Sequence, residues 1–170
     1  MYTYIHQFST LNTAKIAGKQ APHKAVLLLS IMELIESGII TSPRIVLSEK
    51  LEEAFNRLWK KFIGTSVLFT PKVATPFWHM QGESFYQLFL NNGQDASGRK
   101  ANYSVSWLRE NTYALIDKKL FSLMQDENAR AEFRVVLIST YLQDLHGSAN
   151  RSAMASSIIA ILGFMLQTAA

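Results

Sequence analysis

Apolar residues recur at helical spacing over most of the chain, which predicts a largely helical fold. The strongest segment is 22–37, where apolar positions cover most of the circumference of a helix. A helix that is apolar on nearly every side is normally buried, so we expect this segment to be the central helix of the core. Gly38 follows at the position where helices commonly end in the left-handed conformation.

Several other segments have the pattern of shorter or amphipathic helices. Residues 2–12 carry apolar side chains at helical spacing, and Ser48 is a suitable N-cap for a helix that ends at Gly64. One face of that helix consists of apolar side chains, namely Leu51, Phe55, Leu58, Trp59 and Phe62. Segment 104–145 predicts two or three further helices, with Asp126 as the cap of the last long one.

The middle of the chain has a different pattern. Pro71 and Pro76 exclude a long helix there, and "FYQLFL" at 85–90, followed by "NNG", is typical of a strand that enters a turn. We expect a β-hairpin formed by residues around 77–80 and 85–90. A short β-branched piece also occurs at 43–48. The predicted fold class is therefore α+β and predominantly helical, with five to seven helices around a central buried helix and a small β-hairpin.

The length of 170 residues predicts one compact domain with a short appendage. We place the domain at 1–146 and the appendage at 147–170, where the composition shifts to small and apolar residues. Its continuous apolar portion, 158–166, is much shorter than the roughly 20 residues of a membrane-spanning helix. This tail is expected to be an extra helix, a dimer contact or an artificial extension, and no membrane association is expected.

Charge and cysteine content narrow the range of partners and compartments. The 17 Lys and Arg residues exceed the 13 Asp and Glu residues, a formal net charge of +4 that suits contact with a polyanion. The absence of cysteine excludes disulfides, thiolate metal sites and a cysteine nucleophile. The first ten residues lack the pattern of a signal peptide. We expect a cytoplasmic protein.

The motif "APHK" at 21–24 is the first candidate for a binding site. Pro22 at a helix start loses no hydrogen bond, and the amides that follow it lie at the positive end of the helix dipole, where anions bind. His23 and Lys24 add two basic side chains at the same place. The alternative is an ordinary helix start with both basic side chains in solvent.

The motif "ATPFWHM" at 74–80 is the second candidate. Pro76 offers a compact apolar surface, and His79 lies close by in the sequence; Phe77 and Trp78 are expected to be core residues that face opposite ways along a strand. Further along, the polar, glycine-containing loop 92–102 is long enough to close over a ligand.

That loop contains Arg99 and Lys100, and arginine is the commonest specific reader of guanine. The alternative is that both side chains are merely solvated.

Signs of catalysis are few. The four histidines have no metal-ligand spacing, and the chain contains no HExxH, Walker, GxGxxG or GxSxG motif. We expect neither an enzyme nor a protein that needs a metal or another cofactor.

Taken in order, three features give the chain a family resemblance. These are "APHKAVLLLSIMELIE", the spacing of Leu51, Phe55 and Trp59, and "PKVATPFWHM" followed by an aromatic strand. With them the chain resembles the sulfur-binding domain of McrA-like, type IV modification-dependent restriction endonucleases, which recognises DNA whose backbone carries a phosphorothioate. The resemblance covers residues 1–145 and leaves the tail unexplained.

The resemblance implies a mainly helical domain that grips duplex DNA from its major-groove side and seats the sulfur in a small apolar surface cavity. Pro22, Thr75, Pro76 and His79 correspond to the cavity, with Pro76 in direct contact with the sulfur. Some family members have a bulky aromatic residue where this chain has Thr75, and a small residue where it has His79.

The resemblance also implies roles around the cavity. His23 and Lys24 would contact the phosphorothioate and its neighbours, and Arg99 and Lys100, with Gln20, would read bases. Full-length members carry an HNH nuclease after the binding domain, and no such segment is expected here. The chain would then bind without cutting, with a nuclease in another chain or a homodimer formed through the tail.

Two other functions are compatible with the residues alone. Helices followed by a small hairpin are also typical of a winged-helix DNA-binding regulator, which would have no preference for sulfur. The apolar tail, in turn, would suit a protein-interaction module that uses residues 151–170.

Overall fold

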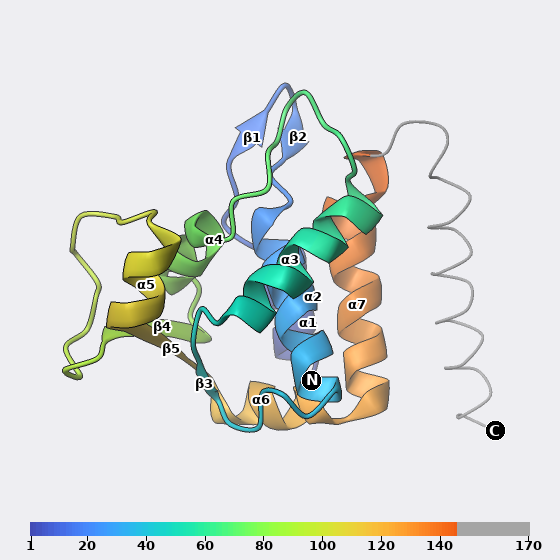
Figure 1. The fold of residues 1–170 in the computed structure, drawn as a ribbon. Helices are drawn as coiled ribbons and strands as arrows, with labels where there is room; N and C mark the ends of the chain where they lie inside the picture. The colour runs from blue at the N-terminus through green and yellow to red at the C-terminus, as the bar shows by residue number, and fades with distance from the viewer. Residues whose placement is uncertain (146–170) are drawn as a thin grey trace.

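A central buried helix organises the fold, as the sequence predicts. The computed structural model describes residues 1–145, apart from the side chain of Asp144. Helix α2, His23–Glu36, has eleven buried residues among its fourteen. It packs against α3 (Glu49–Phe62), α4 (Ala74–His79), α6 (Lys118–Gln125) and α7 (Glu127–Tyr141), which surround it in Figure 1.

The remaining helices complete the predicted set. Helix α1, Tyr2–Ser9, packs on α7, and α5, Val105–Asn111, leads directly into a strand; short 3-10 turns occur at Met80–Gly82 and Gln143–Leu145. The described residues thus contain seven α-helices, at the upper end of the predicted number.

The predicted helix ends are confirmed by their local geometry. The Ser48 side chain accepts a hydrogen bond from the Leu51 amide, and the Asp126 side chain accepts one from the Ala129 amide. Gly38 and Gly64 follow α2 and α3 with φ angles of 70° and 63°. In this left-handed region a Cβ atom would be strained, which is why glycine ends both helices.

Two small antiparallel sheets accompany the helices. The larger has the strand order β3-β5-β4, with β3 at Arg44–Ile45, β4 at Tyr86–Leu90 and β5 at Thr112–Ile116. Strand β3 lies within the β-branched piece predicted at 43–48. In the smaller sheet, β1 (Lys15–Ile16) and β2 (Lys19–Gln20) form a hairpin whose turn residues, Ala17 and Gly18, both have positive φ.

The hairpin predicted for 77–80 and 85–90 is wrong. Residues 74–79 form helix α4, and β4 pairs with β5. Pro76 lies in the first turn of α4, where its missing N–H costs no intrahelical hydrogen bond. Phe77 and Trp78 are both buried, as expected of core residues, but they lie on a short helix rather than a strand. This helix packs against α2, and Phe77 contacts Tyr86 at the start of β4.

The partner strand β5 falls inside the segment for which only helices were predicted. The residues "TYALI" alternate between buried and half-buried positions, the period of a strand rather than of a helix. The segment does contain the three helices α5, α6 and α7.

None of the described helices is long and apolar enough to cross a membrane. The predictions for 147–170, including a dimer contact and a boundary after residue 146, concern residues outside the described part of the chain and remain predictions.

Candidate functional site

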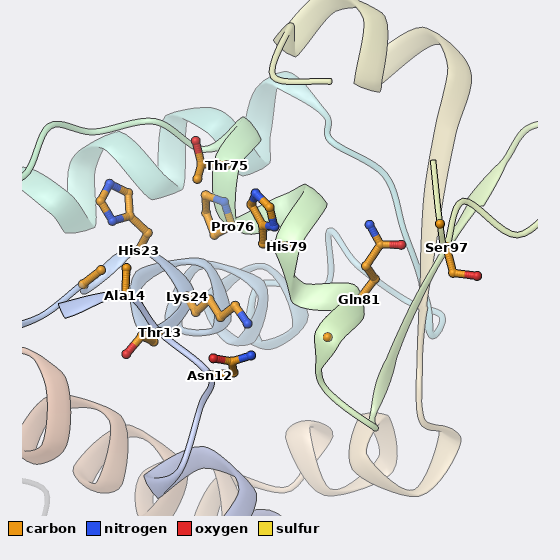
Figure 2. Close-up of a pocket in the computed structure, with 13 residues that line it drawn as sticks. Asn12, Thr13, Ala14, His23, Lys24, Thr75, Pro76, His79, Gln81 and Ser97 are labelled. Carbon is orange, nitrogen blue, oxygen red and sulfur yellow. The ribbon is translucent and has the colours of Figure 1, made fainter. Parts of the chain in front are cut away.

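A pocket of about 580 Å³ lies where four separate segments meet, beside the start of α2. Figure 2 shows its lining, with Pro76 and His79 on α4 opposite His23 and Lys24 at the start of α2. The lining residues are Asn12, Thr13, Ala14, Ala21, His23, Lys24, Thr75, Pro76, His79, Gln81, Gly82, Ser97 and Gly98. The two motifs singled out in the sequence therefore meet at one pocket.

Helix α4 supplies the apolar wall of the pocket. Pro76 is buried in the fold with part of its ring surface on the pocket, and Thr75 is half-buried beside it. His79 is exposed one turn further along, and a 2.7 Å hydrogen bond joins its Nε2 to the Tyr103 hydroxyl. Helix α4 thus places a proline ring in its first turn and an imidazole at its end, three residues apart, beside the same pocket.

His23 is held firmly at the start of α2. A 2.8 Å hydrogen bond joins its Nε2 to the Thr70 carbonyl, and its ring centroid lies 4.7 Å from that of Trp59. Burial lowers the pKa of His23 below its ordinary value; the bond to Thr70 opposes this shift and the charge of Lys72 adds to it. The ring is therefore neutral at pH 7, with Nε2 as the donor to the carbonyl.

The side chain of Lys24 is not solvated. Its Nζ lies 2.5 Å from Oε1 of Glu83, and the two side chains are only 9% and 10% exposed. Partial burial, with a smaller contribution from the Lys24 charge, lowers the pKa of His79. Both pocket histidines are thus neutral near pH 7, and the charged lysine already has a counterion.

The start of α2 also presents backbone amides to this region. Pro22 is the N-cap of the helix rather than its first residue, and the Val26 amide donates the first turn's hydrogen bond to the Pro22 carbonyl. The amides of His23 and Lys24 come before Val26 in the chain, so they have no acceptor within the helix. They lie at the positive end of the helix dipole. Pro22 itself is buried and is not among the lining residues.

The other sequence-predicted residues flank the pocket rather than line it. Gln20 lies in β2, next to the lining residue Ala21. Arg99 and Lys100 are exposed directly after the lining residues Ser97 and Gly98, and Arg99 donates a 2.8 Å hydrogen bond to Oε1 of Gln94.

Sequence reasoning missed part of the lining. The segment Asn12–Ala14 and the turn residues Gln81 and Gly82 are polar or small and follow no periodic pattern, so nothing in the sequence marks them. The only signal was for Ser97 and Gly98, because the loop 92–102 was long enough to cover a ligand. In the described part of the chain no cluster of three or more His, Asp or Glu side chains could hold a metal ion.

The fold and the pocket define a small, predominantly helical binding module. Residues 2–149 match the model of a protein family described as ScoMcrA-like, DNA sulfur-binding domain, and the chain belongs to this family. The family resemblance drawn from the three sequence features is thereby confirmed, and with it the coarse function of a DNA sulfur-binding module.

Solved structures share the fold. The sulfur binding domain of ScoMcrA complexed with phosphorothioated DNA has 18% identity and a TM-score of 0.62, with 91% of this chain and 98% of that chain covered. The sulfur binding domain of SprMcrA, also complexed with phosphorothioated DNA, has 16% identity and a TM-score of 0.62, with 96% and 94% covered.

A third structure is the type IV phosphorothioation-dependent restriction endonuclease ScoMcrA, with 16% identity and a TM-score of 0.61. The match covers 93% of this chain and 30% of that one. A search of curated proteins finds no match.

Proposed function

We propose that the chain binds double-stranded DNA that carries a backbone phosphorothioate and seats the sulfur against Pro76 in the pocket beside α2. The observation that carries this proposal is the meeting of Pro76, His23 and Lys24, from two motifs far apart in the sequence, at one pocket. The complexes of the two related sulfur binding domains with phosphorothioated DNA support the same ligand.

The chemistry of the wall favours sulfur over oxygen. Sulfur is larger, more polarisable and less strongly hydrated than the oxygen it replaces, so burial against an apolar ring costs a phosphorothioate less than an ordinary phosphate. Thr75 and His79 complete this wall beside Pro76, whereas Pro22 is buried at the start of α2 and does not line the pocket. Discrimination then depends on contact with the proline ring.

Affinity comes from groups that hold the charge shared by both kinds of phosphate. The amides of His23 and Lys24 lie opposite Pro76, where they can contact the phosphorothioate and its neighbours, whereas the Lys24 ammonium is already paired with Glu83. Gln20, Arg99 and Lys100 flank the pocket, at positions suited to base contacts around the modified step.

The module reads the modification without cutting DNA, and cleavage would be supplied by another domain or chain. A winged-helix regulator, the alternative from the sequence, loses its basis because the hairpin at 77–80 and 85–90 is not formed.

A titration of one duplex sequence, with and without a phosphorothioate, tests the proposal. We expect the modified duplex to bind at concentrations at which the unmodified duplex remains free, measured by gel shift or fluorescence anisotropy. Equal affinities for several sequences and both sulfur diastereomers would overturn it.

A further inference from the structure

We propose that Glu83 is a specificity-determining residue, which neutralises Lys24 inside the pocket and so prevents tight binding of ordinary phosphate. The inference rests on the proposed function and assigns a role to a residue that neither sequence motif contains.

The geometry places Glu83 between two walls of the pocket. Its Oε1 accepts a hydrogen bond from Nζ of Lys24 at 2.5 Å and another from the Asn12 amide at 3.0 Å. Lys24 belongs to α2, Asn12 to the segment before β1, and both line the pocket. Glu83 follows Gly82, the end of the turn that closes the same pocket.

Because it is buried, the ion pair between Lys24 and Glu83 has a strong electrostatic effect on a ligand in the pocket. Both side chains are about nine-tenths buried, so solvent screens them little, and a charge at this place acts strongly on a ligand nearby. Lys24, His23 and His79 are the titratable side chains among the described lining residues, and the two histidines have lowered pKa values. With Lys24 paired, the lining has almost no net charge.

A nearly neutral pocket is what discrimination between sulfur and oxygen requires. An unpaired ammonium would form a charge-assisted hydrogen bond with a phosphate oxygen, which is a stronger acceptor than sulfur. That bond would offset the desolvation cost that excludes ordinary phosphate from the apolar wall. Glu83 removes this gain, because Lys24 already donates to a carboxylate.

The experiment compares Glu83→Gln with the wild type on modified and unmodified duplexes at one pH near 7, where both pocket histidines are neutral. The glutamine carbonyl can still accept both hydrogen bonds, but the negative charge is lost. We expect binding of the unmodified duplex to strengthen on the order of tenfold and that of the modified duplex to strengthen less. The preference for sulfur falls accordingly.

Salt dependence gives an independent readout. In Glu83→Gln the Lys24 ammonium has no carboxylate partner and can neutralise a phosphate, so the slope of log affinity against log salt for the unmodified duplex should steepen by about one unit. The matched control is Glu53→Gln, which changes the net charge equally but breaks the exposed pair with Lys50, outside the pocket. We expect this control to leave the sulfur preference unchanged.

The outcomes separate the two proposals. A wild type without sulfur preference contradicts the proposed function. A wild type with the preference, together with a folded Glu83→Gln that keeps it in full, overturns only the role of Glu83. If a thermal melting curve shows that Glu83→Gln is unfolded, the double variant Lys24→Gln/Glu83→Gln takes its place in the titrations. A sulfur preference close to that of the wild type supports neutralisation, and its loss contradicts it.

Discussion

At the residue scale, the site depends on side chains whose surroundings set their chemistry. Pro76 is tolerated in α4 because it lies in the first turn, and it faces the start of α2 across the pocket. Lys24 lies in a basic motif but its ammonium is buried against Glu83. The residue type alone indicates neither the wall nor the counterion.

Replacing Pro76 tests the wall directly. Pro76→Ser removes the apolar methylenes that would contact the sulfur, each worth about 0.8 kcal/mol when buried, so we expect the phosphorothioated duplex to bind on the order of tenfold more weakly. Binding of the unmodified duplex should change little, as judged by parallel titrations. Pro43→Ser, remote from the pocket, is the control and should leave both affinities unaltered. An equal loss for the two duplexes would argue against a sulfur contact.

The pocket histidines predict a dependence of stability on pH. Burial lowers the pKa of His23, and partial burial lowers that of His79, so the unfolded chain takes up protons at a higher pH than the folded chain does. The contribution of the two neutral histidines to stability is fully present above an ordinary histidine pKa of about 6.5, and it is lost as the pH falls through their folded-state pKa values. We expect the melting temperature of His23→Gln to fall less than that of the wild type between about pH 7.5 and pH 5. Parallel curves for the two proteins would contradict this expectation.

At the element scale, helix capping ties distant parts of the chain together. Asp126 caps α7 through the Ala129 amide, whereas Oδ1 of Asp117 accepts from two amides of α6 and from the Tyr4 hydroxyl of α1 at 2.6 Å. Asp117 therefore serves as the cap of α6 and as a link between α6 and α1.

These two caps should differ in their contribution to stability. Asp126→Ala is expected to lower the free energy of unfolding by about 1 kcal/mol, the usual effect of a lost N-cap. Asp117→Ala should cost more, because Tyr4 also loses its partner. Urea denaturation measures both values, and Asp117→Asn, which can still cap, serves as the control. A smaller loss for Asp117→Ala than for Asp126→Ala would show that the Tyr4 link contributes nothing.

The elements also show where the sequence pattern has predictive power. The central helix α2, the amphipathic helix α3 and the caps at Ser48 and Asp126 were predicted because periodicity and capping are local properties. Helix α4 and the pairing of β4 with β5 were not, because an apolar run of a few residues suits a buried strand or a buried helix equally well. At residues 74–79, packing against α2 selects the helix α4 over a strand.

At the scale of the whole molecule, the excess of basic residues, +4 overall, should govern affinity rather than selectivity. Binding of a polyanion releases counterions, so both duplexes should bind more weakly as salt rises from roughly 50 to 200 mM. Their affinity ratio should change little, because contact with the pocket wall is short-ranged. Titrations at several salt concentrations check this, and a ratio that falls as steeply as the affinities would place the discrimination in the charges.

The sequence by itself determined the predominantly helical class, the central helix, the caps and the two motifs that carry the family resemblance. These depend on spacing and residue type, which are properties of a local stretch of chain. Only the tertiary structure decided that Asn12–Ala14, Gln81 and Ser97 share a pocket with Pro76, and that Lys24 forms an ion pair with Glu83. The segment Asn12–Ala14 lies more than fifty positions from Pro76, as Lys24 does from Glu83, and these residues meet only through packing around α2, which no local pattern encodes.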